Sequence, residues 1–300
     1  MIFKSEVPSH LAQHTLIDYL AERFTYHPRE QWLIHIRENR ILLNDKPAAP
    51  GTTVMRGDIV TYKPLPFSEP EANLNYQIVY EDEWYIGVNK PPNLLVHRAG
   101  KAFTKNLVYQ LRIRKKEYKD VSVINRLDRN TSGVVVAAKS SDAAVKLGKM
   151  FHIRNIKKEY FALVHSSPHT VPYTIDLPIA KNVECTKYPR YHIDLDNGKS
   201  SKTEIITMQR IGNSHSLLTV IPYTGRTHQI RVHLQSIDCP LVGDHVYGTE
   251  SPEESDKWIQ RQALHCTRIT FDHPFTREPC VIEAELPEDM ERLIRILGKK

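Results

Sequence analysis

Residues 121–138 read VSVINRLDRNTSGVVVAA, with apolar runs at both ends and a polar loop between them. This pattern is typical of two strands joined by a connection. The loop places one carboxylate, Asp128, between the guanidinium groups of Arg126 and Arg129. A neighbouring arginine favours the ionised form of an aspartate, and an arginine two positions away can contact a phosphate. Charge spacing alone leaves two interpretations open: a structural ion pair that stabilises a turn, and an active site.

Outward from this loop, the chain reads as many short strands with few helices. Ser140 or Ser141 can cap one helix that carries Ala144, Leu147 and Phe151. The pattern predicts an α+β domain around a largely antiparallel sheet, rather than the alternating strands and helices of a doubly wound fold. Strands are predicted at Ile78–Tyr80, Trp84–Asn89, Val121–Ile124, Val134–Ala138, Tyr160–Val164, Leu217–Val220 and Val281–Leu286.

The amino-terminal part of the chain is predicted to form a separate small module. Helices are expected from Thr15 to Phe24 and from Pro28, and strands at Ile41–Leu43 and Ile59–Tyr62. The proline-rich segment Lys63–Pro70 indicates a linker. We therefore expect a module at residues 1–65, a linker at 66–74 and a larger domain at 75–300.

Composition indicates a globular protein with a polyanionic partner. The net charge is +6 and the pI is near 9.0, and clustered Lys and Arg gain free energy by displacing counterions from phosphates. Four scattered cysteines without a C-x-x-C pair argue against a zinc knuckle and a disulfide framework. The amino terminus has no apolar leader, and no apolar run approaches the roughly 18 residues of a membrane span. We expect a cytoplasmic protein, with a monomer as the default state.

Four motifs, in order along the chain, resemble one known family. The loop resembles the R-L-D-x-x-T-S-G signature of the RluA-type pseudouridine synthases. Residues 80–97 (YEDEWYIGVNKPPNLLVH) resemble that family's opening strand pair, and residues 157–164 (KKEYFALV) resemble its tyrosine-bearing strand. Residues 224–234 (TGRTHQIRVHL), followed by 243–248 (GDHVYG), resemble its arginine-bearing segment. The resemblance implies an RNA pseudouridine synthase whose catalytic domain has a mixed, largely antiparallel sheet.

The resemblance also implies three catalytic residues. Asp128 would act as a nucleophile and leaving group on the uridine, and whether it attacks the base or the sugar stays open. Tyr160 matches the family tyrosine, whose ring can stack on an extruded base, although by pattern alone it is more readily a core residue. Arg231 matches the arginine that pairs with the catalytic carboxylate. The chemistry requires no metal, nucleotide or redox cofactor.

The expected partner is RNA, either ribosomal or transfer RNA. By resemblance, Arg126 helps to flip the target nucleotide out of its stack. Further RNA contacts are expected at Arg129, Arg226, His228 and Gln229. The basic stretches Arg112–Lys119 and Arg154–Lys158 either follow RNA phosphates or are solvated faces.

The amino-terminal module carries a resemblance of its own. The pattern from Trp32 through Arg37 and Arg40 to Val60 is similar to the S-four-like RNA-binding module that precedes the catalytic domain in some members of the family. Arg37 and Arg40 are therefore expected to contact RNA. The alternative is any small helical module with exposed arginines.

The chain departs from the family pattern at two places. Asn125 stands where many members carry His before R-L-D, which affects substrate contacts and subgroup more than activity. The strand end His165-Ser166 lacks a glycine that is often found there, so the geometry of that turn is open.

His228 and His233 suggest a metal site, but neither has an acidic or cysteine partner at ligand spacing.

Two other functions compete with this interpretation. A non-catalytic RNA-binding or ribosome-assembly factor would keep the fold, and an Asp128→Asn variant would then keep its biological effect. A base deaminase is excluded, because the H-x-E and P-C-x-x-C zinc pattern is absent and Pro279-Cys280 has no second cysteine after it.

Overall fold

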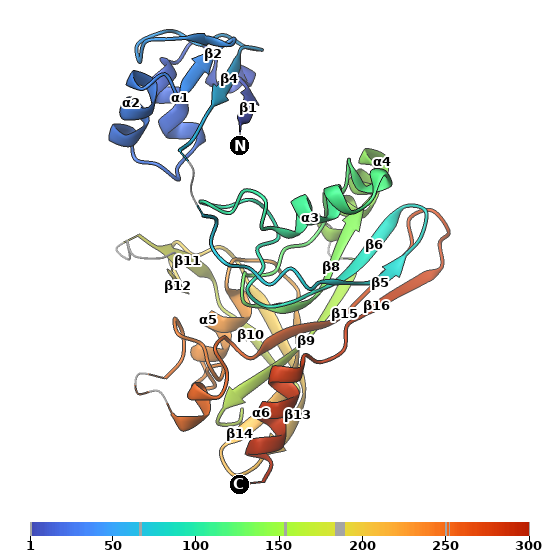
Figure 1. Ribbon diagram of the computed structural model, residues 1–300. Helices are drawn as coiled ribbons and strands as arrows, with labels where there is room; N and C mark the ends of the chain where they lie inside the picture. Colours follow the sequence, from blue (N-terminus) through green and yellow to red (C-terminus); the bar gives the residue numbers. More distant parts are fainter. Residues whose placement is uncertain are drawn as a thin grey trace. The chain divides into compact units, whose positions relative to one another are not determined.

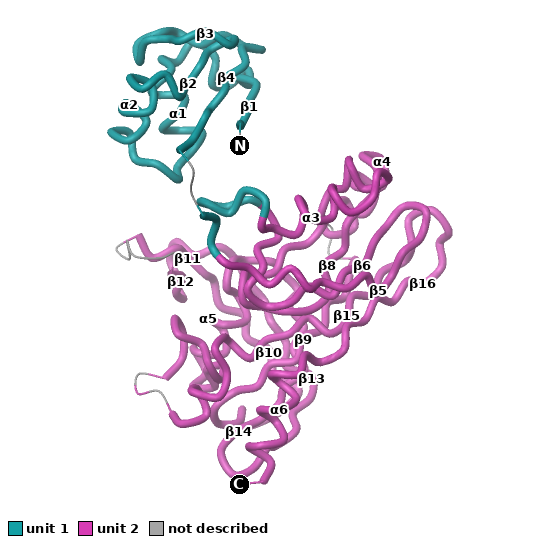
Figure 2. The backbone as a smooth tube through the Cα atoms, viewed as in Figure 1, with its two compact units in different colours: residues 1–70, 98–104 teal, residues 71–97, 105–300 magenta. Residues whose placement is uncertain are grey.

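The computed structural model describes residues 2–65, 68–152, 155–183, 190–249, 251 and 253–299 (Figure 1). Pro66 and Phe67 of the expected linker, Arg154 of one basic stretch, and Cys185 lie outside the described residues. The chain divides into two compact units (Figure 2). Unit 1 comprises residues 1–70 and 98–104, and unit 2 comprises residues 71–97 and 105–300. The sequence did not indicate that residues 98–104 belong to the amino-terminal unit.

Unit 1 is a small antiparallel sheet with two helices. Its strand order is β1-β4-β2-β3. The Thr15 hydroxyl caps α1 by accepting the backbone N–H of Asp18, and Pro28 occupies the N-cap of α2. Both predicted helices are confirmed, whereas the short strands β1 and β3 were not predicted. The elements are β1 (Phe3–Glu6), η1 (Ser9–Leu11), α1 (Leu16–Arg23), α2 (Arg29–Arg37), β2 (Ile41–Leu43), β3 (Lys46–Pro47) and β4 (Ile59–Tyr62).

Residues 98–104 join unit 1 through aromatic and cationic contacts. The rings of Phe3 and Phe103 stack with centroids 4.3 Å apart. The Arg98 guanidinium lies 4.0 Å from the centroid of Phe103 and 4.9 Å from that of Phe3. This segment is therefore an integral part of the amino-terminal unit.

Unit 2 is built on a ten-stranded sheet. Its order is β10-β13-β14-β9-β15-β8-β6-β5, with β16 paired to β15 and β7 paired to β8. The pair β8–β15 is parallel and the other pairs of this sheet are antiparallel. A mixed, largely antiparallel sheet with flanking helices confirms the predicted α+β class.

The elements of unit 2 follow in chain order. The strands are β5 (Gln77–Glu81), β6 (Tyr85–Lys90), β7 (Ser122–Val123), β8 (Ser132–Ala138), β9 (Ile156–His165), β10 (Tyr173–Asp176), β11 (Ile179–Asn182), β12 (Arg190–Ile193), β13 (Lys202–Ile211), β14 (His215–Pro222), β15 (Leu264–Asp272) and β16 (Pro279–Glu283). The helices are α3 (Leu107–Arg114), η2 (Lys116–Tyr118), α4 (Ser141–His152), α5 (Gln229–Gln235), η3 (Glu254–Lys257) and α6 (Glu288–Leu297).

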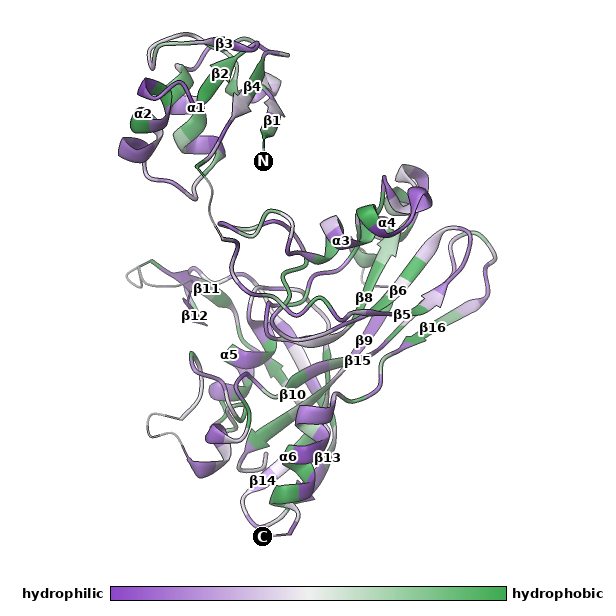
Figure 3. Ribbon diagram, viewed as in Figure 1, coloured by the Kyte–Doolittle hydropathy of each residue, from purple (hydrophilic) through white to green (hydrophobic). Residues whose placement is uncertain are grey.

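The core of unit 2 lies around β8, which is buried at every position. A strand covered on both faces needs a continuous apolar run, and Val134–Ala138 supplies one. The carboxy-terminal helix α6 is amphipathic, with bands of both hydropathy colours in Figure 3. Its buried Met290 and Leu293 pack in one cluster with Leu163 of β9.

The structure corrects several predicted boundaries. Strand β7 covers only Ser122–Val123, and β16 ends at Glu283 rather than Leu286. Helix α5 was not predicted, because polar and apolar residues alternate from Gln229 to Leu234, which is the period of a strand, and the helix buries all six of them. Among the described residues, the helices are too short or too polar to cross a bilayer.

Candidate active site

A cleft of about 330 Å³ in unit 2 brings together segments that are far apart in the sequence. Its size suits a small ligand or a single extruded base. It is lined by seven of the ten predicted site residues: Asp128, Tyr160, Arg231, Arg126, Arg226, His228 and Gln229. The loop between β7 and β8, strand β9 and the start of α5 supply these side chains. The sequence motifs therefore converge on one place in the fold.

Asp128 and Arg231 form an ion pair at this cleft. The Nη1 of Arg231 donates to Oδ2 of Asp128 over 3.1 Å, across 103 positions of sequence. The Asp128 side chain is 28% exposed, whereas that of Arg231 is 7% exposed. Asp128 can therefore meet a ligand while its charge is balanced from within the protein.

A second carboxylate, Asp244, anchors the same arginine from behind. Nε and Nη2 of Arg231 donate to the two Asp244 oxygens over 2.7 and 2.8 Å. Asp244 also accepts the backbone N–H groups of Val246 and Tyr247, and the Arg231 guanidinium lies 4.8 Å from the Tyr247 ring centroid. Asp244 belongs to the quoted motif GDHVYG, but no role was assigned to it from the sequence.

The electrostatics of this triad are dominated by burial and by the two opposite charges. Burial acts to lower the pKa of Arg231, but the hydrogen bonds and charge of Asp244, followed by those of Asp128, raise it above its usual value. Burial acts to raise the pKa of Asp244, but Arg231 and two backbone N–H groups lower it. Arg231 and Asp244 are thus both charged at neutral pH.

The loop that carries Asp128 is held at its two ends by Asn125 and Gly133. The Asn125 amide donates to the carbonyl of Val134 over 3.2 Å and accepts the N–H of Val136 over 2.8 Å. Gly133 has a φ of +113°, and a Cβ there would lie 2.2 Å from the Cys266 carbonyl oxygen of the parallel neighbour β15. Asn125 therefore has a structural role at the base of the loop.

Four side chains from outside the loop support its middle. Lys90 is fully buried and its Nζ donates to the Arg129 carbonyl over 3.2 Å. Arg261 donates to the Asn130 carbonyl over 3.3 Å, and Gln262 donates to the Thr131 hydroxyl over 3.1 Å. The remaining contact is between Ser132 Oγ and His265 Nδ1, which are 3.0 Å apart. Sequence reasoning missed these supports because they come from distant positions with ordinary local patterns.

Tyr160 is both a strand residue and a cleft residue. It is 7% exposed, stands in β9 opposite Cys266 of β15, and lines the cleft. Burial, and then the charge and hydrogen bond of the Cys266 thiol, raise the pKa of Tyr160 well above its usual value. The phenol is therefore neutral at physiological pH and keeps its proton. Lys158 lines the same cleft, and burial lowers its pKa.

His228 and His233 do not converge on a metal. His228 has a φ of +57°, and its Nε2 lies 3.8 Å from Asp128 Oδ2 while its Nδ1 lies 2.9 Å from the Tyr247 hydroxyl. Burial lowers the pKa of His228 against the opposing charge of Asp128. His233 is buried elsewhere, where it hydrogen-bonds Thr203.

The remaining residues predicted to contact RNA differ in whether their side chains are exposed or buried. Arg126 is exposed at the cleft, and Arg226 is exposed there with its Nε donating to the Ser200 carbonyl. The Gln229 amide is buried and bonds Thr224, Arg226, Lys202 and Thr203, so it organises the turn before α5.

Arg129 lies outside the cleft lining. Its guanidinium donates to Asn93 Oδ1 and to the carbonyl of Glu71, both over 3.0 Å. Charge spacing alone left open a structural ion pair between Asp128 and a neighbouring arginine of the loop, but the arginine bonded to Asp128 is Arg231. Arg37 and Arg40 belong to unit 1, where Arg37 is exposed and Arg40 pairs with Glu38.

Comparisons with known proteins identify relatives of this chain. A family model described as RNA pseudouridylate synthase matches residues 84–236. The chain is 32% identical to ribosomal large subunit pseudouridine synthase D of Neisseria meningitidis, covering 97% of this chain and 80% of the relative. It is 28% identical to ribosomal large subunit pseudouridine synthase C of Vibrio vulnificus, covering 97% and 95%. The solved structure of human RNA Pseudouridylate Synthase Domain Containing 1 matches with a TM-score of 0.60 and 25% identity, covering 78% and 98%.

The chain therefore belongs to the RNA pseudouridylate synthase family, in its RluA-type branch. It is an isomerase that acts on RNA and converts uridine to pseudouridine. The alternative of a non-catalytic RNA-binding or assembly factor is not favoured.

Proposed function

We propose that Asp128 is the nucleophile of the isomerisation and that Arg231, anchored by Asp244, holds it in position. The observation that carries this proposal is the 3.1 Å bond from Arg231 to an Asp128 carboxylate that stays 28% exposed in the cleft. The carboxylate attacks and the carbon–nitrogen glycosidic bond breaks. The base rotates and rejoins the same sugar through carbon, the carboxylate departs, and the ring carbon loses a proton while the freed ring nitrogen gains one. The first attack falls on either the base or the sugar.

The other cleft residues receive roles that follow from their surroundings. The neutral Tyr160 ring supplies a flat surface for the base, and its hydroxyl can transfer a proton. Arg126 is an exposed cation at the mouth of the cleft, suited to fill the place of a nucleotide that has left its stack. Arg226 and His228 can contact the backbone of the same nucleotide.

We further propose that the substrate is large-subunit ribosomal RNA. The two bacterial relatives described above carry that RNA in their names. Unit 1 would bind RNA as an S-four-like module through Arg37 and Arg40, supported by an exposed arginine at the end of α2 and a net charge of +6 for the chain. The cytoplasmic location and the monomeric state expected from the sequence stay predictions.

The experiment is pseudouridine mapping by carbodiimide modification and primer extension. RNA from cells that lack the gene is incubated with the wild type, with Asp128→Asn, or with Asp120→Asn, a surface aspartate of the same unit. We expect new stops in large-subunit RNA with the wild type and Asp120→Asn, and a loss of at least about 10³-fold in rate with Asp128→Asn.

Each outcome tests a different part of the proposal. Stops in transfer RNA instead would overturn the substrate class and leave the nucleophile intact. Turnover by Asp128→Asn near the wild-type rate would remove Asp128 from the mechanism.

A further inference from the structure

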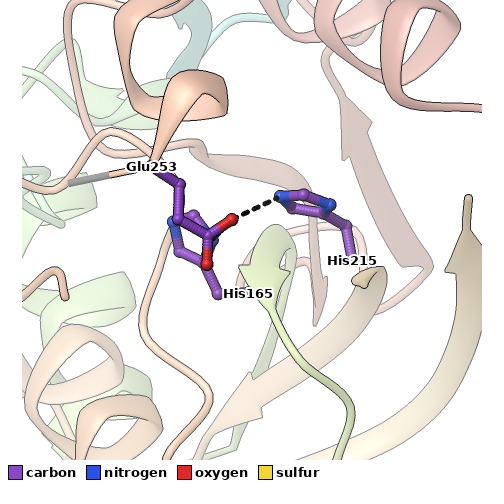
Figure 4. A group of neighbouring side chains, drawn as sticks. All are labelled: His165, His215 and Glu253. Atoms are coloured by element: carbon purple, nitrogen blue, oxygen red, sulfur yellow. Dashed lines mark ion pairs between the residues drawn. The ribbon is translucent and has the colours of Figure 1, made fainter. Parts of the chain in front are cut away.

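Two histidines and a glutamate meet at the ends of two interior strands of the large sheet of unit 2. Strand β9 ends at His165 and β14 begins at His215, and the two residues face each other directly in the antiparallel register. Such a pair projects on the same face, and the two imidazole centroids are 5.2 Å apart. Glu253, immediately before η3, turns its carboxylate toward both rings (Figure 4). None of the three is among the described residues that line the catalytic cleft.

The spacing of the three polar atoms is close to that of a metal site. His165 Nδ1 and His215 Nε2 lie 3.4 and 4.0 Å from Glu253 Oε2, and all three atoms lie within 4.8 Å of one another. Tetrahedral Zn²⁺ with bonds of about 2.1 Å separates neighbouring ligand atoms by about 3.4 Å. The distance between His165 Nδ1 and Glu253 Oε2 already matches this value. The other two distances between ligand atoms require side-chain movements on the order of 1 Å.

The surroundings prepare both imidazoles as ligands. His165 Nε2 lies 2.9 Å from Asp256 Oδ1, which leaves the lone pair of Nδ1 for the cluster. That Nδ1 is buried and has no hydrogen-bond partner. His215 Nδ1 lies 3.0 Å from Ser214 Oγ, and its Nε2 lies 3.2 Å from the Ser255 hydroxyl, a contact that a bound ion would replace. A carboxylate that holds the far nitrogen of a ligand histidine is the usual support of a zinc ligand.

We propose that His165, His215 and Glu253 bind one Zn²⁺ ion and that Asp256 is a positioning residue for His165. Two imidazoles and a carboxylate suit Zn²⁺ better than Mg²⁺ or Ca²⁺, which prefer oxygen ligands, and the fourth position is left for water. The site fastens the segment around η3 to the ends of β9 and β14.

The proposed metal site is also connected to Arg231 in the cleft, through the backbone at Gly243 and Asp244. The Oδ1 atom of Asp256 that faces His165 also accepts the N–H of Gly243 over 2.6 Å. The next residue is Asp244, whose carboxylate holds Arg231. A bound ion therefore stiffens the segment that sets the position of the catalytic arginine.

The test uses the untagged full-length protein after treatment with a chelator. Zn²⁺ is titrated in competition with a chromophoric chelator, and Co²⁺ is titrated as a spectroscopic substitute. We expect one ion per chain, the intense visible absorption of tetrahedral Co²⁺, and a Tm that rises with Zn²⁺ concentration. Glu253→Gln and His215→Gln should each weaken binding at least about tenfold, and Asp256→Asn about 10- to 100-fold.

The controls are the exposed neighbours Glu254→Gln and His169→Gln, which should bind as the wild type does. Glu253 is 49% exposed, and the amide oxygen of a glutamine can still accept the Asp256 N–H that the carboxylate caps, so the variant should keep the wild-type Tm in chelator. Without a metal, a bound proton could hold the same three side chains together through hydrogen bonds. Zn²⁺ would then leave the wild-type Tm unchanged, and this result overturns the proposal. Stoichiometric binding that survives both Glu253→Gln and His215→Gln overturns it as well.

Discussion

Arg231 donates hydrogen bonds from two of its nitrogens to Asp244 and from the third to Asp128. The two bonds to Asp244 measure 2.7 and 2.8 Å, and the bond to Asp128 measures 3.1 Å. The fully buried carboxylate of Asp244 therefore fixes the planar guanidinium, and the remaining nitrogen faces the partly exposed carboxylate of Asp128. Asp128 can change partners during a reaction while the arginine stays in place.

Removing the charge of Asp244 should damage both stability and activity. Asp244→Asn leaves the buried Arg231 without its main counter-charge, which we expect to cost about 3 kcal/mol in the free energy of unfolding. We also expect kcat to fall about 10²-fold with a small change in KM, because Arg231 no longer orients Asp128. Urea unfolding and single-turnover kinetics measure the two effects. The exposed Asp272→Asn serves as the control, and an unchanged kcat in Asp244→Asn would separate Asp244 from catalysis.

Two arginines of the same loop should behave differently. Arg126 is exposed in the cleft, so Arg126→Ala should lower kcat/KM about 10²-fold and change stability by less than about 0.5 kcal/mol. Arg129 bonds Asn93 and Glu71 outside the cleft, so Arg129→Ala should cost about 1 kcal/mol of stability and affect kcat/KM less. Turnover assays and thermal unfolding on both variants decide this. The reverse order of effects on kcat/KM would contradict the assignment of Arg126.

The backbone at Gly133 should tolerate no side chain. Gly133→Ala combines a φ of +113° with a contact of 2.2 Å to the Cys266 carbonyl, and we expect a loss of at least about 3 kcal/mol. The matched control is Gly148→Ala within α4, where no atom beyond the adjacent residues and the backbone of the helix itself lies within 4 Å of the new methyl group. That change should stabilise the protein by about 0.5–1 kcal/mol. Chemical unfolding measures both, and equal effects would show that the close approach of β15 is not maintained in solution.

The buried His265 should make stability depend on pH. Burial lowers the pKa of His265 to about 4, below the value near 6.5 of an unfolded chain. The unfolded state therefore binds more protons between these values, and the stability contributed by neutral His265 is lost as the pH falls from about 6.5 to about 4.

The check compares the wild type with His265→Gln at several pH values in this window. The difference in their free energies of unfolding isolates this histidine, because the other titrating groups are common to both proteins. The advantage of the wild type should shrink toward pH 4. A difference that stays constant across the window would mean that His265 does not titrate as described.

The sequence predicted much of the site because its chemistry lies in short contiguous motifs. The run around Asp128 and the segment from Thr224 to Arg231 each carry several of the cleft residues. Asp128 and Arg231 were predicted as a pair, and the structure places them in contact.

The features that the sequence did not predict depend on contacts between residues that are far apart in the chain. Arg261 and His265 support the loop from more than 130 positions away, and His165, His215 and Glu253 share no local spacing. Ser166 shows the same limit at the backbone level. It takes a φ of +68° where glycine is common in the family, and its N–H bonds the Ser214 carbonyl over 2.7 Å. Tertiary contacts, absent from any local pattern, hold this conformation.

The parallel pairing of β8 with β15 has a consequence for the order of events during synthesis. The loop of Asp128 leaves the ribosome long before Cys266, against which Gly133 packs, and before Arg261 and His265. A contact between such distant segments pays a large loop-closure entropy and forms late. The nascent chain therefore exposes Asp128 before the residues that support its loop have been made. The loop gains its full support only after β15 has left the ribosome.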